Sequence, residues 1–160
     1  MKIGMVLKEL HVAENDLAHA LLRLAERHKV DHELFHLGRD LAQWSHRHVS
    51  EIAGIAPDYG EHLDPEPQRE LGIVERARER ASELTGRSTS SELSMLRDLR
   101  DVYLKASAAL LDWEMLGQAA QAIRHDDLLS LATRCQAETT RQIKWANSKI
   151  KEASTQALVT

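Results

Sequence analysis

Five of the nine histidines in this chain fall within residues 25–52, at His28, His32, His36, His46 and His48. Imidazole is a common ligand for transition metals, and it gains or loses a proton near neutral pH. His32 and His36 are four residues apart, which places them on one face of a helix, and His28 lies across a predicted turn at Lys29 and Val30. We therefore treat His28, His32 and His36 as one candidate cluster. It is either a metal site or a set of exposed, pH-sensitive groups at the end of a hairpin.

A second group of polar residues interrupts apolar stripes. Leucines recur at steps of three and four from about residue 4 to 28, and Glu14 stands in that stripe. A second helix is predicted over about 32–52, with Asp31 as its N-cap, and His48 interrupts its stripe. Counting from the turn near 30–31 places Glu14 opposite His48. A carboxylate in a helical core is costly unless it is paired, protonated or bound to a metal.

The second half of the chain predicts another hairpin. Ser90 or Ser91 can cap a third helix, and a turn at 124–126 leads into a fourth, for which Asp126 can act as the cap. Counting from this turn places Glu138 opposite Trp113 and Glu114. Four groups could then share one level of the bundle, at Glu14, His48, Glu114 and Glu138. They would either bind a metal or be carboxylates satisfied by ion pairs and water.

The predicted fold is all-α, a four-helix bundle of two antiparallel hairpins. A long crossover over 54–90, carrying a short charged helix at 68–84, joins the hairpins. Residues 1–153 form a single domain, and 154–160 are expected to be a frayed tail.

This topology resembles the ferritin-like four-helix bundle, and Glu33-Leu34-Phe35-His36 has that family's Glu-x-x-His spacing. The resemblance implies a di-iron or di-manganese site built from carboxylates and histidines. Two features depart from the pattern. Arg141 stands where a histidine should follow Glu138, and Glu33 lies close to the turn, roughly 24 Å along the helix from the level of Glu14.

Composition excludes several classes of protein. The formal net charge is −4 and no basic run is present, so nucleic acid is not an expected partner. No apolar stretch approaches the roughly 20 residues that span a bilayer, and no secretory signal is recognised, so we expect a cytoplasmic protein without membrane association. Cys135 is the single cysteine, and we expect it to be a buried apolar residue and not a nucleophile.

These patterns leave two functions open. The first is a non-catalytic bundle that forms a homo-oligomer or binds a protein partner, through the 68–84 helix or the aromatic flank around Trp44 and Trp145. The alternative is a metal-binding bundle, or an oxidoreductase, that holds iron, manganese or zinc in a reduced carboxylate and histidine site.

Overall fold

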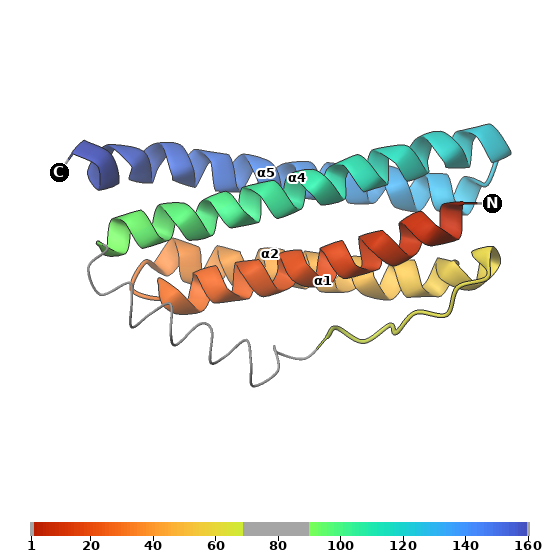
Figure 1. Cartoon of the computed structure of the whole chain (residues 1–160), viewed down its shortest axis with the longest axis horizontal. Helices are drawn as coiled ribbons and strands as arrows, with labels where there is room; N and C mark the ends of the chain where they lie inside the picture. Colours follow the sequence, from red (N-terminus) through yellow and green to blue (C-terminus); the bar gives the residue numbers. More distant parts are fainter. Residues whose placement is uncertain (1, 69–89, 160) are drawn as a thin grey trace.

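The computed structural model describes residues 2–68 and 90–159, and four long α-helices account for most of them. They are α1 (Ile3–Arg27), α2 (His32–Ile55), α4 (Ser91–Ile123) and α5 (Asp126–Val159), with a short 3-10 helix, η1 (Ala56–Tyr59), after α2. The predicted all-α bundle of four helices is therefore confirmed (Figure 1).

The helices pair as two antiparallel hairpins, α1 with α2 and α4 with α5. α1 also packs along α4, whereas α2 and α5 approach each other more sparsely. In Figure 1, α2 and α4 run in the same direction, so the chain must return along the length of the bundle between them. The predicted helix at 68–84 lies outside the described residues, apart from Gln68.

Local hydrogen bonds fix most of the helix ends. The Asp31 carboxylate accepts from the Leu34 N–H at 3.1 Å, and the Ser90 hydroxyl accepts from the Leu93 N–H at 3.3 Å, so both predicted caps are confirmed. Asp126 is the first residue of α5 and not its cap, and it lies where the helix dipole favours an acidic side chain. Arg124, with φ of 56°, ends α4.

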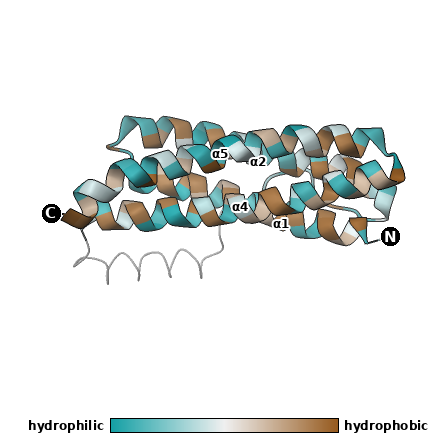
Figure 2. Cartoon of the chain, turned by 90° about the horizontal axis from the view of Figure 1, so that it is seen from above, coloured by the Kyte–Doolittle hydropathy of each residue, from teal (hydrophilic) through white to brown (hydrophobic). Residues whose placement is uncertain are grey.

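The core consists of two apolar clusters stacked along the bundle. One contains Leu7, Leu10 and Trp113, and the other contains Leu17, Leu21 and Leu99. Hydrophilic residues alternate with hydrophobic ones along every helix (Figure 2). None of the described helices is both long and apolar enough to cross a membrane.

The first part of the crossover is an extended strap along α1. Three buried side chains of α1, spaced four residues apart, hold its backbone. His11 Nε2 lies 2.7 Å from the Asp64 carbonyl oxygen, and His19 Nε2 lies 2.9 Å from that of Gln68. Asn15 Oδ1 accepts from the Gln68 N–H at 3.0 Å. Sequence periodicity did not identify this polar row on α1.

The C-terminal segment corrects one expectation. Residues 154–160 were predicted as a frayed tail, but α5 remains helical to Val159. The Ser154 hydroxyl donates to the Ile150 carbonyl oxygen one turn earlier, which is a bond that a helical backbone permits.

Gly4 of α1 packs closely against the end of η1 and the start of the strap. A Cβ added there would lie 2.8 Å from the Tyr59 carbonyl oxygen and 2.9 Å from Glu61 Cγ. We predict that Gly4→Ala lowers the free energy of unfolding by about 1–3 kcal/mol, because backbone atoms must move to relieve the overlap. Urea denaturation measures the change.

Gly54→Ala is the matched control, since a Cβ at Gly54 would meet nothing within 4 Å. On α2 this substitution should stabilise by up to about 1 kcal/mol through the helix propensity of alanine. Equal effects of the two substitutions would contradict the close packing of the strap on Gly4.

Candidate functional site

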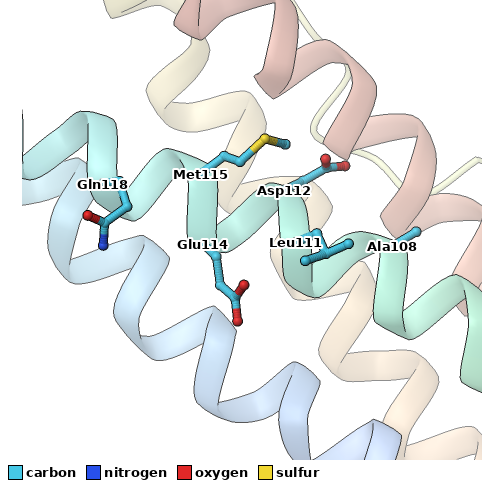
Figure 3. Close-up of a pocket in the computed structure, with 6 residues that line it drawn as sticks. All are labelled: Ala108, Leu111, Asp112, Glu114, Met115 and Gln118. Atoms are coloured by element: carbon cyan, nitrogen blue, oxygen red, sulfur yellow. The ribbon is translucent and has the colours of Figure 1, made fainter.

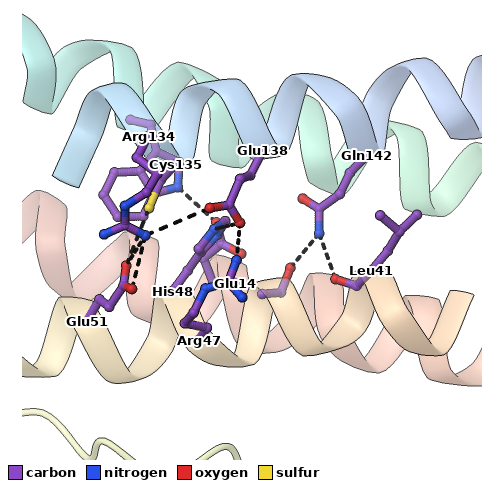
Figure 4. Close-up of polar contacts among 11 residues, drawn as sticks. Glu14, Leu41, Arg47, His48, Glu51, Arg134, Cys135, Glu138 and Gln142 are labelled. Carbon is purple, nitrogen blue, oxygen red and sulfur yellow. Dashed lines mark hydrogen bonds and ion pairs between the residues drawn. The ribbon is translucent and has the colours of Figure 1, made fainter. Parts of the chain in front are cut away.

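A buried polar layer at mid-bundle takes one side chain from each helix: Glu14 from α1, His48 from α2, Trp113 from α4 and Glu138 from α5. Trp113 Nε1 donates to Glu14 Oε1 at 2.8 Å, and the same oxygen lies 3.0 Å from His48 Nδ1. On the other side of the imidazole, Nε2 lies 3.3 Å from Glu138 Oε2. The result is one continuous hydrogen-bonded chain across the bundle (Figure 4).

The apolar stripes position these side chains. Glu14 stands between Leu10 and Leu17, which belong to different core clusters, and it therefore lies where the two clusters meet. Each helix delivers its polar residue to the same level because the flanking apolar residues fix its rotation and height. The geometry of the polar layer is thus set by packing above and below it.

Burial and charge act in opposite directions on His48. The side chains of His48 and Glu14 are 0% exposed and that of Glu138 is 13% exposed. Burial alone would lower the pKa of His48, but hydrogen bonding to Glu14 and the charges of Glu14 and Glu138 outweigh it and raise the pKa. The imidazole therefore favours its doubly protonated form, in which both nitrogens donate to carboxylates.

Arginines surround the outer end of the layer, where α2 and α5 meet. Arg47 donates to Glu138 Oε2, the oxygen that faces His48. Arg134 lies 3.8 Å from Glu138 Oε1 and pairs with Glu51 of α2 at 2.9 Å. Glu138 is therefore held by cations from both helices.

The structure brings together three of the four residues proposed as one metal site. Glu14, His48 and Glu138 share the polar layer. Counting from the turn near 30–31 had predicted that Glu14 lies opposite His48. Glu114 does not join them, because it is exposed on the outside of α4 (Figure 3). Trp113, its neighbour in sequence, faces inward and supplies the α4 member of the layer.

The second candidate cluster does not converge on one point. His28 Nε2 pairs with Asp98 Oδ2 of α4 at 2.8 Å, so this histidine joins the two hairpins. His32 and His36 are exposed, and their rings are stacked with centroids 6.3 Å apart. Glu33, of the Glu-x-x-His motif, pairs with Lys149 of α5.

The polar layer does not fit a metal centre as it is arranged. Both nitrogens of His48 face carboxylate oxygens at hydrogen-bond distance, so neither offers a lone pair to a cation. Glu14 Oε2 is buried and lacks a partner among the described residues, but a single oxygen is too few ligands. Within 2–68 and 90–159, no group of three or more His, Cys, Asp or Glu side chains could hold a metal ion.

Cys135 is enclosed beside the layer and fully buried. Burial raises the pKa of its thiol, and the carboxylates of Glu51 and Glu14 raise it further. A thiol in this environment stays protonated, so it is a poor nucleophile.

Two hydrogen bonds between α2 and α5 were not predicted from the sequence. Gln142 is buried, and its amide donates to the Leu41 carbonyl oxygen at 2.9 Å and to Ser45 Oγ at 3.0 Å. Its place beside the apolar face of the fourth helix was visible in the sequence, but its partners belong to the other hairpin.

Comparisons of this chain with protein-family models, with curated proteins and with solved structures find no match.

His48→Leu should lower the free energy of unfolding by about 3–5 kcal/mol, because it leaves Glu14 as a buried charge whose remaining donor is Trp113. Chemical denaturation near neutral pH measures the loss. His36→Leu is the control, since that exposed histidine should change stability by no more than about 0.5 kcal/mol.

The contribution of the pair should also depend on pH. The folded state raises the pKa of His48 above the model value of 6.5. Stability from this group is therefore complete below pH 6.5 and is lost as pH rises through the folded pKa. The reference is the double variant Glu14→Gln/His48→Leu, which lacks His48 and its carboxylate partner on α1. We expect the unfolding free energy of wild type minus that of the double variant to fall as pH rises above 6.5. A difference that grew instead would contradict the raised pKa of His48.

Metal addition tests the alternative inferred from the sequence. A ligand at a hundred times its dissociation constant stabilises a folded protein by about 2.7 kcal/mol, which is a clear rise in melting temperature. We predict that Fe(II), Mn(II) and Zn(II) cause no rise in melting temperature that depends on His48. His36→Ala removes any weak binding to the stacked pair at the surface. A rise that persists in His36→Ala and disappears in His48→Leu would establish a metal site in the polar layer.

Proposed function

We propose that this chain is a non-catalytic, ferritin-like helical bundle that acts by binding protein. One observation carries the proposal. A hollow of about 460 Å³ lies on the surface between α2 and α5, and its walls include the indoles of Trp44 and Trp145, with Leu37 and the charged side chains of Asp40 and Arg141. Tryptophan and arginine are enriched among the residues that dominate protein–protein binding energy.

The polar groups of the hollow support a protein ligand. The indole N–H of Trp145 is shielded from water and has no acceptor among the described residues. Asp40 and Arg141 take part in none of the ion pairs that the structure describes. A peptide segment with an apolar or aromatic side chain between the two indoles could pair with both charges and supply a carbonyl acceptor. We therefore commit to a protein segment of that chemistry as the occupant.

The buried layer supports a role without catalysis. His48 has both ring nitrogens engaged and is closed to solvent, and Cys135 is buried with a raised pKa. General acid–base or nucleophilic catalysis requires such a group to reach a substrate atom at about 2.6–3.2 Å. His48 and Cys135 are enclosed, whereas the hollow between α2 and α5 is open at the surface.

Arg141→Glu tests the proposal. The tagged chain is crosslinked in extract of its native host, the captured protein is identified and purified, and its dissociation constant is measured by calorimetry. We expect Arg141→Glu to weaken binding by about tenfold or more, because a charge at the edge of the contact is reversed.

Lys144→Glu is the matched control, since Lys144 is also an exposed cation of α5 but lies outside the hollow. It should leave the dissociation constant within about twofold of the wild-type value. A purified partner that binds the Arg141→Glu variant as tightly as wild type would exclude the hollow as its site.

A further inference from the structure

The outer face of α4 carries an exposed apolar stripe that no described element covers. Leu104, Leu111 and Met115 are 48%, 60% and 53% exposed, and Ala108 lies between them on the same face. The opposite face of the helix, with Ala106, Trp113 and Ala120, is in the core. α4 therefore has two apolar faces, of which one is buried inside the bundle.

The stripe has the form of a helix-packing surface. A hollow of about 510 Å³ is lined by Ala108, Leu111, Asp112 and Met115, with Glu114 and Gln118 at its edges (Figure 3). Residues spaced i, i+3, i+4 and i+7 form the four-residue hole that receives a side chain from a facing helix in a coiled coil. A helix is thus the element that fits this face.

The order of the stripe allows a second copy of α4 to be that helix. Its members are separated by steps of four, three and four residues, which read the same in either direction. In an antiparallel pair with a two-fold axis between residues 109 and 110, Leu104 lies opposite Met115 of the second copy, and Ala108 lies opposite Leu111. At every level of the stripe, an apolar side chain of one copy then packs against an apolar side chain of the other.

The charges beside the stripe agree with the same register. Lys105 directly follows Leu104, and Asp112 directly follows Leu111. The two charged residues are seven positions apart, so they lie on the same side of the stripe. Antiparallel packing places Lys105 of each copy beside Asp112 of the other. Within the chain, Lys105 pairs with Asp101 at 2.8 Å, whereas the described ion pairs include no cation for Asp112. Burial raises the pKa of Asp112 and the nearby carboxylate of Glu9 raises it further, so a lysine from a second copy would relieve this repulsion.

α1 widens the surface. Met5 and Val12 are 53% and 57% exposed, and they lie on either side of Glu9, the residue that approaches Asp112. Specific interfaces bury at least about 1,200 Å² in total, which is more than one short helical stripe provides. We therefore include the exposed Met5 and Val12 of α1 in the same surface.

We propose that the chain forms a two-fold symmetric dimer in which the outer face of α4 packs antiparallel against that of a second copy. The inference goes beyond the proposed function, because it assigns a second copy of the chain to a different surface. It uses the α1–α4 side of the bundle, whereas the Trp44 and Trp145 hollow lies between α2 and α5, so the two proposals can fail separately.

Sedimentation equilibrium of the full chain over a wide range of concentration tests the dimer. We expect wild type to dimerise, and Leu111→Glu to be a monomer with unchanged helical content by circular dichroism, because it places two carboxylates near the axis. Val30→Glu is the control at another exposed apolar position and should leave the dimer intact. A wild-type monomer at all concentrations, or a dimer unaffected by Leu111→Glu, would overturn the proposal.

Charge exchange tests the register. Lys105→Glu and Asp112→Lys should each weaken the dimer by about tenfold or more, since each brings like charges together across the interface. The double variant Lys105→Glu/Asp112→Lys restores the pairing and should recover most of the affinity. A double variant as weak as the single variants would overturn the antiparallel arrangement. Arg141→Glu should dimerise normally, so loss of partner binding in that variant reports on the hollow alone.

Discussion

His48 lies between Glu14 and Glu138, so its two ring nitrogens are satisfied by α1 on one side and by α5 on the other. Trp113 extends the same chain of hydrogen bonds to α4. A shift of α1 or α2 by one turn would separate the buried Glu14 and His48, and a shift of α4 would leave the Trp113 N–H without its acceptor. Both changes are costly in an apolar interior. Leucine positions alone would tolerate such a shift better, because one apolar turn resembles the next. The polar layer therefore fixes the alignment of the four helices.

The two hairpins are held together differently on their two sides. Apolar residues dominate where α1 meets α4, as in the clusters around Trp113 and Leu99. The seam between α2 and α5 is mainly polar, with contacts from Glu51, His48, Ser45 and Glu33 of α2 to residues of α5. Ion pairs and hydrogen bonds are directional, so they determine register more strongly than they add net stability. The hollow that we assign to partner binding opens along this polar seam.

Sequence reasoning succeeded where the geometry is local to one hairpin. The leucine stripe of α1, the Asp31 cap and the position of Glu14 opposite His48 all follow from helical periodicity and from counting outward from a turn. Relations between hairpins were less accessible, because the crossover imposes no register that can be counted. Within the second hairpin, counting from the turn placed Glu138 opposite both Trp113 and Glu114. The carboxylate was chosen as the site residue, whereas Trp113 is the one that faces the layer. The hydrogen bonds of His11 and His19 to the strap were missed because their partners are backbone atoms of an irregular segment.

A carboxylate, an imidazole and a second carboxylate in hydrogen-bond contact form a set of groups that could transfer protons if a substrate reached them. In this chain the same contacts that raise the pKa of His48 occupy both of its nitrogens, and the side chain is fully enclosed. The apolar clusters on either side of the layer also exclude water from it. The groups with the most reactive chemistry are therefore committed to holding the helices together. The surfaces that we propose for recognition lie on the outside, at the α2–α5 hollow lined by Trp44 and Trp145 and at the exposed apolar stripe of α4.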